Sequence, residues 1–247
     1  MPTAIVTGAT SGLGVDIARR LVDDGFDVIV TGRSVERGEA VAQSIGDKAT
    51  FVQADLTEDG AADRVVEAAL SATGRLDVLV NNAGIDYNAK LEEAPVADIR
   101  ATFETNAIAP IVMAQAAARQ FIKQGEGGSI VNVTSRLASI GVPEMSVYSS
   151  SKGALKSFTI AAAVEWAPHR IRVNSVAPGM ARTEMFTEWL ATFDDPAGKE
   201  REVSEAVPLG RVAEPADVAH AVSYFASPGA AYITGGNIPI DGGYTAK

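Results

Sequence analysis

A tyrosine and a lysine stand four residues apart, at Tyr148 and Lys152, and Ser135 precedes the tyrosine by thirteen residues. Four residues make about one helical turn, so the phenol and the ammonium would lie on one face of a helix. A free tyrosine has a pKa near ~10, and a neighbouring cation lowers that pKa by favouring the phenolate. The pair could therefore exchange a proton with an alcohol oxygen, which Ser135 could hold by a hydrogen bond. Alone, such a pair is more often surface packing.

The start of the chain reads as a strand, a glycine turn and a helix. Thr3 to Thr7 is short and β-branched, as in a buried strand. The amphipathic helix after the turn carries on one face Leu13, Ile17, Leu21 and Val22. Glycines let the backbone approach a pyrophosphate, and the helix N-terminus offers free N–H groups. The spacing Gly-x-x-x-Gly-x-Gly differs from the usual dinucleotide fingerprint, but its place between strand and helix favours nucleotide binding. The turn reads Gly8-Ala9-Thr10-Ser11-Gly12-Leu13-Gly14.

Strand and helix signals alternate along the whole chain. Strands are predicted at 3–7, 27–31, 50–53, 78–81, 129–134, 172–177 and 237–240, and helices include 35–45, 61–73, 99–123 and 148–166. This alternation predicts a single-domain α/β Rossmann fold over residues 1–247, with a doubly wound parallel seven-stranded sheet and helices on both faces. The stretch 180–213 is expected to be irregular, because Asp194-Asp195-Pro196-Ala197-Gly198 reads as a breaker. We interpret it as a substrate lid, with an ordinary surface loop as the alternative.

The composition excludes several classes of function. A net charge of −10 argues against nucleic acid as a partner. The chain has no cysteine and only two histidines, so a zinc-dependent dehydrogenase is improbable and we expect no metal site. No apolar run reaches about 18 residues, so no membrane span is expected. The first strand begins at residue 3, which leaves no room for a signal peptide, and we expect a cytoplasmic location.

Six segments, in order along nearly the whole chain, resemble the short-chain dehydrogenase/reductase family, classical type. They are Thr7-Gly8-x-x-x-Gly12-x-Gly14; Asp55-Leu56; Asn81-Asn82-Ala83-Gly84; the set Asn106, Ser135, Tyr148 and Lys152; Pro178-Gly179 with Thr183; and Asp241-Gly242-Gly243. The pattern is most similar to 3-oxoacyl-[acyl-carrier-protein] reductases and their relatives. Ser150 replaces a usual Ala and Ala138 a frequent Gly. Both changes are small-for-small and put no catalytic role in doubt, though Ala138 would adjust the substrate side.

The resemblance implies reversible hydride transfer between a nicotinamide and a ketone or secondary alcohol. Tyr148 would be the general acid and base, and Ser135 would orient and polarise the substrate oxygen. Lys152 would lower the pKa of Tyr148 and bond the ribose, and Asn106 would hold a water that connects Lys152 to solvent. A helix-interior Asn with a satisfied side chain is the plainer interpretation of Asn106. A non-catalytic nucleotide sensor is disfavoured, because such relatives commonly lack the Tyr or the Lys.

The resemblance also implies which residues hold the cofactor. At the end of the second strand, Gly32 occupies the position where an NAD site wants an acid. Arg33 follows, and its fork suits a 2′-phosphate, so NADP(H) is favoured over NAD(H). Ser11 stands where many NADP(H) enzymes carry a second base, which argues against strict preference. The cofactor set is Gly8, Thr10, Ser11, Gly12, Leu13, Gly14, Arg33, Ser34, Asp55, Leu56, Asn82, Ala83, Gly84, Tyr148, Lys152, Pro178, Gly179, Ala181 and Thr183.

The substrate is expected to be a small-molecule carbonyl or alcohol with a largely apolar body. Arg136 and Glu144 are expected to be solvated rather than substrate-binding. We place Glu126 near the cleft, where carrier-dependent relatives have a basic patch, with His169 or Arg170 as the other position. An acidic carrier would then meet a like charge and associate poorly. Apolar surface would come from the lid residues Met180, Met185, Phe186, Trp189, Leu190 and Phe193, and from Val142, Met145 and Val147.

Alternatives to this function remain open. They are an NAD-dependent sugar, polyol or hydroxysteroid dehydrogenase and a 3-oxoacyl-[acyl-carrier-protein] reductase. The stretches 99–123 and 148–166 are richer in apolar residues than one sheet face needs. They therefore predict a homotetramer, and the resemblance points to the same two helices as a four-helix interface.

Overall fold

The computed structural model describes residues 1–247, and its centre is a parallel sheet of seven strands. The order of the strands across the sheet is β3-β2-β1-β4-β5-β6-β7, and every neighbouring pair is parallel. The predicted doubly wound α/β fold is confirmed, with strand ends within one residue of those expected. The strands are β1 (Thr3–Thr7), β2 (Asp27–Gly32), β3 (Ala49–Gln53), β4 (Val78–Asn81), β5 (Gly128–Val133), β6 (Ile171–Pro178) and β7 (Asn237–Ile240).

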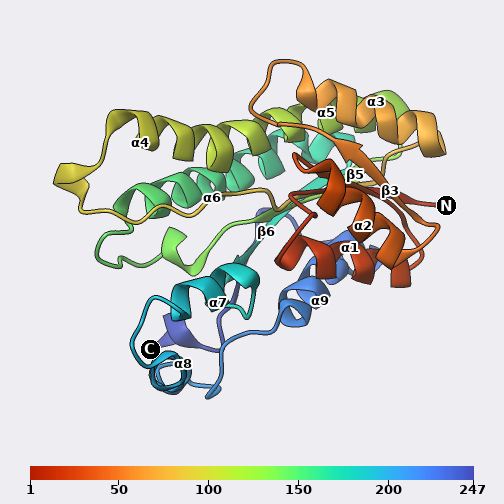
Figure 1. Cartoon of the computed structure of the whole chain (residues 1–247). Helices are drawn as coiled ribbons and strands as arrows, with labels where there is room; N and C mark the ends of the chain where they lie inside the picture. Colours follow the sequence, from red (N-terminus) through yellow and green to blue (C-terminus); the bar gives the residue numbers. More distant parts are fainter.

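Helices cover both faces of the sheet (Figure 1). One face carries α1 (Leu13–Asp23), α2 (Val35–Ile45) and α9 (Pro215–Ala226). The other carries α3 (Ala61–Thr73), α4 (Val96–Phe103), α5 (Ala109–Gln124) and α6 (Ser146–Trp166). Two further helices, α7 (Glu184–Leu190) and α8 (Pro196–Glu205), follow β6 and lie near the C-terminus in Figure 1. None of the helices combines the length and apolar character needed to cross a membrane.

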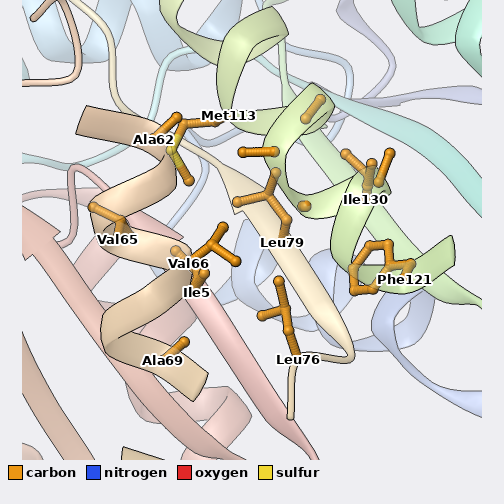
Figure 2. Close-up of a cluster of buried hydrophobic side chains, with 14 of the residues drawn as sticks. Ile5, Ala62, Val65, Val66, Ala69, Leu76, Leu79, Met113, Phe121 and Ile130 are labelled. Carbon is orange, nitrogen blue, oxygen red and sulfur yellow. The ribbon is translucent and has the colours of Figure 1, made fainter. Parts of the chain in front are cut away.

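The core has two halves because successive strand residues point to opposite faces. On β1, Ile5 packs into one half while Ala4 and Val6 pack into the other, and all three are fully buried. Figure 2 shows the half that contains Ile5, where side chains of α3 and α5 meet Leu79 and Ile130 of the sheet. Near-continuous apolar strands of this kind are typical of a sheet covered on both faces.

The single helix predicted at 99–123 is wrong, because the structure divides it. A π turn, Glu104–Ile108, separates α4 from α5. Pro110 has no N–H, so the Asn106 carbonyl loses its ordinary donor four residues later. The helix widens there to bonds five residues apart, with Ala109 N donating to Glu104 O. The widened turn brings Asn106 to a fully buried position.

The expectation that residues 180–213 are irregular is also wrong, because this stretch contains the two short helices α7 and α8. Thr183 caps α7 by accepting from the Phe186 N–H at 3.3 Å. Asp195 caps α8 by accepting from the Gly198 N–H at 2.9 Å, and Pro196 is the first helical residue. The supposed breaker is therefore a helix start, since Asp followed by Pro is a favoured combination at an N-terminus.

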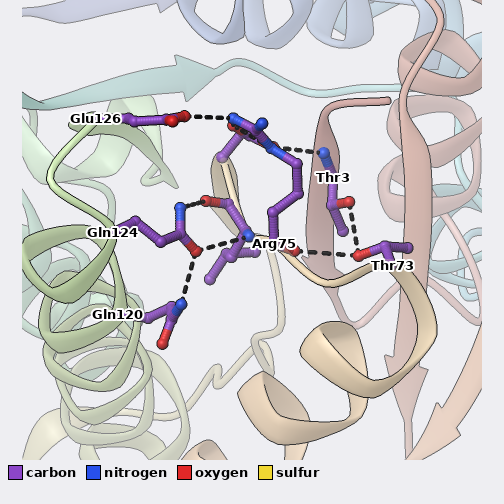
Figure 3. Close-up of polar contacts among 8 residues, drawn as sticks. Thr3, Thr73, Arg75, Gln120, Gln124 and Glu126 are labelled. Carbon is purple, nitrogen blue, oxygen red and sulfur yellow. Dashed lines mark hydrogen bonds and ion pairs between the residues drawn. The ribbon is translucent and has the colours of Figure 1, made fainter.

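A polar network joins the amino ends of the strands (Figure 3). Arg75 binds Asp77 at 2.5 Å and Glu126 at 2.9 Å, and Asp77 accepts from the Thr3 N–H at 2.7 Å. Glu126 precedes β5 and Arg170 precedes β6, so both lie at the edge opposite the carboxyl ends of the strands. The expectation that Glu126 lies near the cleft is wrong. The expectation that His169 or Arg170 marks a second position near the cleft is wrong for the same reason.

Candidate active site

A cleft of about 1000 Å³ opens at the carboxyl ends of the strands. It lies where the strand order reverses, since the chain runs outward from β1 through β2 and β3 and then returns to β4 on the other side. Such a switch point is where ligands bind in doubly wound sheets. The cleft reaches from Arg33 at the end of β2 to Ser135 and Tyr148 beyond β5. All predicted site residues line it except Gly14 and Asn106, which are buried behind it.

The glycine turn leaves no room for side chains. Gly8 has a φ of +62°, and a Cβ there would lie 2.6 Å from the Cα of Ala83. A Cβ on Gly14 would lie 2.5 Å from the Gly8 carbonyl oxygen. Backbone therefore packs directly on backbone, and N–H groups at the start of α1 stay accessible from the cleft. This arrangement fits a bound pyrophosphate.

Asn82, at the end of β4, holds this turn in place. Its amide donates to the carbonyl oxygens of Thr7 at 2.9 Å and Gly8 at 3.1 Å. The Thr7 hydroxyl in turn accepts from the backbone N–H groups of Asn82 and Ala83. The segment Asn82-Ala83-Gly84 thus connects the first and fourth strands at the floor of the cleft.

The segment that runs from the end of β2 into α2 presents two arginines to the cleft, Arg33 and Arg37. A Cβ on Gly32 would lie 2.7 Å from the Thr10 side chain, so a larger residue there would force a shift. Ser34 caps α2 by accepting from the Arg37 N–H at 3.3 Å. Arg37 lines the same end of the cleft as Arg33 and was missed in the sequence. The i, i+4 spacing of the two arginines was the available signal.

Asp55 lies at this end of the cleft with its carboxylate already engaged. Its Oδ1 accepts from the Thr57 hydroxyl at 2.6 Å and the Thr57 N–H at 3.0 Å. These two bonds, with a smaller contribution from nearby Arg33, hold the pKa of Asp55 below its usual value. Asp55 is thus fixed in place, and Leu56 beside it completes this side of the cleft.

Tyr148 and Lys152 lie one turn apart on α6, as predicted. The Lys152 Nζ is buried, donates to the Val133 carbonyl at 3.1 Å and lies 5.9 Å from the centroid of the Tyr148 ring. Ser135 follows β5, and its Oγ accepts from the Leu137 N–H at 3.1 Å. The Ser135 side chain is near enough to Tyr148 to lower the pKa of the phenol. The three side chains therefore meet at one end of the cleft.

The proton affinities of the pair differ from expectation. Burial, with help from the Asp86 carboxylate, raises the pKa of Tyr148 to about 12, and the Ser135 hydroxyl opposes this only in part. Burial lowers the pKa of Lys152 to about 8, against the opposing effect of Asp86. The expected lowering of the tyrosine pKa by Lys152 is wrong for the chain by itself, because burial raises this pKa and Lys152 is not among the groups that shift it. Asp86, which lines the cleft, is a charged neighbour that the sequence did not suggest.

Asn106 lies behind the pair and binds protein groups. Its Nδ2 donates to the Ile85 carbonyl at 2.8 Å and to the Ser151 hydroxyl at 3.1 Å, and its Oδ1 accepts from the Ile85 N–H at 2.8 Å. A Cβ on Gly84 would lie 3.1 Å from Asn106 Oδ1 and 3.2 Å from Lys152 Nζ. Asn106 thus holds the loop after β4 against α6. Its contact with a water stays a prediction.

The apolar wall is only partly the one expected. Met180, Met185, Phe186 and Trp189 line the cleft, together with Val142 and Met145. Leu190 instead packs with Phe186 and Val212, and Phe193 packs on the Trp189 ring at 4.9 Å between centroids, outside the lining. Val147 is buried away from the cleft. Met185 and Trp189 lie one turn apart on α7 and share the face toward the cleft, whereas Leu190 packs against Val212.

Arg136 is not the solvated residue that we expected. It lines the cleft directly after Ser135, and burial lowers the pKa of its guanidinium. Its Cζ lies 4.0 Å over the centroid of the Tyr244 ring. Glu144, by contrast, is exposed and outside the lining. No group of three or more His, Cys, Asp or Glu side chains in the chain could hold a metal ion.

Comparisons with known proteins agree with this geometry. The family model described as enoyl-(acyl carrier protein) reductase matches residues 8–245. A diacetyl reductase [(S)-acetoin forming] of Staphylococcus epidermidis is 37% identical over 98% of this chain and 97% of its own. A solved short-chain dehydrogenase/reductase family protein is 40% identical, with a TM-score of 0.87 over 99% of this chain and 97% of its own. ElxO with NADP bound is 29% identical, with a TM-score of 0.92 over 100% and 99%. The chain therefore belongs to the short-chain dehydrogenase/reductase family of oxidoreductases.

Proposed function

We propose that the protein interconverts a ketone and a secondary alcohol with NADP(H). The observation that carries this proposal is a single cleft with two different ends. One end is a side-chain-free glycine turn flanked by Arg33 and Arg37, and the other end holds Ser135, Tyr148 and Lys152. The nicotinamide cofactor, when bound, supplies the hydride to the substrate carbon or accepts it.

The side chains of the chain would handle the proton. Tyr148 is protonated at neutral pH, so it can donate its proton to the carbonyl oxygen of a ketone. Ser135 donates a hydrogen bond to the same oxygen and polarises the carbonyl. The phenolate left on Tyr148 is then stabilised by the Lys152 ammonium one turn away. In the direction of alcohol oxidation the same proton returns to Tyr148. Lys152 would also bind the ribose of the cofactor.

Preference for NADP(H) over NAD(H) is supported by the end of β2. Arg33, Arg37 and the Ser34 hydroxyl could bind a 2′-phosphate, and no carboxylate occupies position 32 to bind a 2′-hydroxyl. ElxO, a neighbour in structure, has NADP bound. Ser11 in the glycine turn is the observation that favours the second candidate, an NAD-dependent sugar, polyol or hydroxysteroid dehydrogenase.

We propose a free ketone or alcohol as substrate rather than an acyl chain on a carrier protein. Met185, Phe186 and Trp189 give the cleft an apolar wall, and the net charge of −10 disfavours an acidic carrier. Glu126 no longer contributes to this argument, because it lies at the opposite edge of the sheet. The diacetyl reductase relative acts, by its name, on a small free diketone.

The remaining parts of the proposal concern the whole chain. Residues 1–247 form one catalytic domain, and the segment 180–213, with α7 and α8, acts as a lid over the substrate. Four copies assemble into a tetramer, and the protein works in the cytoplasm. Two observations support the interpretation of this segment as a lid. The segment leaves β6 directly at the cleft, where Met180 and Ala181 line it, and Ala181 pairs with Ala213 at the other end of the segment.

A ketone and alcohol panel with both cofactors tests the proposal. We expect turnover of free cyclic or aryl ketones with NADPH at a kcat/KM well above that with NADH. An acetoacetyl carrier conjugate serves as the comparison at two ionic strengths. A conjugate preferred over every free ketone, increasingly so at low salt, would favour the carrier-dependent reductase instead. Equal or better rates with NADH would favour the second candidate.

A further inference from the structure

Arg136 lies at the substrate end of the cleft with no role in the proton transfer described above. It follows Ser135 and opens the short 3-10 turn Arg136–Ala138 at the end of β5. That turn is fixed by the bond from the Leu137 N–H to Ser135. Arg136 is therefore the immediate chain neighbour of Ser135, the residue that would hold the substrate oxygen. Its side chain lines the same cleft.

Arg136 differs from every other partly buried arginine in having no polar partner. Four arginines in the chain are not fully exposed. Three of them bind protein oxygens: Arg20 pairs with Asp24 at 2.8 Å, Arg75 with Asp77 at 2.5 Å, and Arg172 donates to the Phe225 carbonyl at 2.9 Å. The side chain of Arg136 makes neither a hydrogen bond nor an ion pair within the chain. Its five N–H donors are thus left for something else.

The neighbours of Arg136 position it without using its donors. The Tyr244 ring lies under the guanidinium at 4.0 Å, a cation–π contact that leaves the edge of the fork free. The Asp241 carboxylate, which favours the charge on Arg136, accepts from the Gly243 N–H at 3.0 Å and from the Thr245 N–H and hydroxyl at 3.0 and 2.7 Å. These bonds fix the C-terminal turn that carries Tyr244. Asp241 therefore favours the charge on Arg136 without pairing with it.

The chemistry of such a site selects an anion. Planar guanidinium donors match the two oxygens of a carboxylate, and partial burial strengthens the bond by removing water. Five carboxylates also line the cleft: Asp86, Glu184 and Glu188 are exposed, and Asp55 and Glu104 are partly buried. The repulsion of an anion by the three exposed carboxylates is screened by solvent and salt, whereas the attraction to the half-buried Arg136 is screened less. Arg136 therefore gives the substrate end of the cleft a position that favours an anion.

We propose that Arg136 binds a carboxylate on the substrate, so that the preferred substrates are oxo acids and hydroxy acids with an apolar body between the two functional groups. This inference rests on the proposed function and narrows it. The apolar body would lie against Met185 and Trp189 while the reacting carbon faces Tyr148. Tyr244 is a positioning residue that acts through Arg136.

The proposal is tested by comparing kcat/KM for two substrates that differ only in the charge of one group. The charged substrate is 4-oxocyclohexanecarboxylate, and its kcat/KM is divided by that of its methyl ester, which keeps the ring and removes the charge. We expect the wild-type ratio to exceed about tenfold, the size of a charge-assisted hydrogen bond. Arg136→Met should reduce the ratio about ten- to a hundredfold, mainly through KM. Arg136→Lys should restore part of it, and Tyr244→Leu should lower it less than Arg136→Met.

A binding measurement keeps this inference separate from the proposed function. Cyclohexanecarboxylate has no group to reduce or oxidise, and we expect it, but not cyclohexanecarboxamide, to raise the Tm of the wild-type protein in the presence of NADP⁺. Arg136→Met should abolish that rise. A ratio near one in the wild type, or the same ratio and Tm rise in Arg136→Met, would overturn the role of Arg136 while ketone turnover stands. A Tm rise that needs Arg136, without turnover of any ketone, would instead overturn the proposed function.

Discussion

Tyr148 and Lys152 share a helical turn, and burial shifts both of their pKa values toward the neutral forms of the two side chains. A tyrosine held protonated suits proton donation to a ketone, while a lysine with a pKa of about 8 keeps most of its charge at neutral pH. The reductive direction is therefore the one that the chain supports by itself at neutral pH. Oxidation requires the phenolate, so its rate should rise as the pH increases.

Replacing Tyr148 by Phe should remove the proton donor and keep the ring. We expect kcat to fall by at least about 10²-fold, the lower range for a positioned acid or base. The affinity for NADPH, measured by fluorescence titration, should change little, because the ring still fills its place on α6. Lys152→Ala should lower both turnover and cofactor affinity. Near wild-type turnover in Tyr148→Phe would refute the assignment.

Lys152 should also make the stability of the cofactor-free protein depend on pH. Its folded pKa of about 8 lies below the ordinary lysine value of 10.5, so between these values the unfolded chain binds a proton that the folded chain has released. Stability contributed by this group therefore increases with pH from about 8 upward. We expect a rise of roughly 1–2 kcal/mol between about pH 8 and 9.5.

Urea unfolding of wild type and Lys152→Met at several pH values isolates this contribution. The variant should lack the rise, since Met is uncharged and of similar length, while all other titrating groups are shared. Parallel stability curves for the two proteins would show that the buried lysine does not titrate in this range.

At the scale of elements, the sequence predicted the sheet better than its surroundings. Apolar, β-branched runs set the strands, because a strand covered on both faces has few alternatives. The helix break before α5 was visible as Pro110, but the apolar pattern continues across it and conceals the π turn. The start of α8 was equally visible as Asp195-Pro196 and was interpreted as a breaker, since the same residues favour turns.

In the candidate site, too, the sequence predicted contacts between residues that are near in the chain and missed contacts between residues that are far apart in it. The motif predicted that Ser135, Tyr148 and Lys152 lie together, because all three fall within a short stretch of sequence, after β5 and on α6. It could not place Arg136 against Tyr244, which lies more than a hundred residues later in the chain. It also could not give the direction of the tyrosine pKa, because burial there depends on packing between segments that are distant in sequence.

The start of α2 should determine the choice of cofactor. Arg33→Ala and Arg37→Ala should each raise KM for NADPH about tenfold or more, the effect of one charge-assisted phosphate contact, with a much smaller change for NADH. Arg19→Ala, which removes an exposed arginine from α1 outside the cleft, is the matched control. Equal changes for both cofactors would mean that these arginines do not bind the 2′-phosphate.

At the scale of the whole molecule, the chain leaves apolar side chains uncovered on two adjacent helices. Much of the apolar surface expected on α5 and α6, including Leu155 and Ala117, is buried within the same chain. Of the large apolar side chains that remain exposed, Ile108 at the end of the π turn and Val112 on α5 are one turn apart, as are Ile160 and Val164 on α6, and Ile122 is exposed near the end of α5. Val164 is 75% exposed, which is costly for an apolar side chain unless a partner covers it.

We therefore expect a tetramer in which α5 and α6 pack against the same helices of a second copy. Light scattering should give about four times the chain mass of 25.6 kDa at micromolar concentration. Val164→Glu and Val112→Glu should each place a charge in the interface and reduce the mass by about half, because an unpaired buried charge costs several kcal/mol. Val35→Glu, the same substitution at an exposed valine on α2, should leave the mass unchanged. A wild-type protein that stays monomeric, or a tetramer that tolerates glutamate at both positions, would show that this face is not the interface.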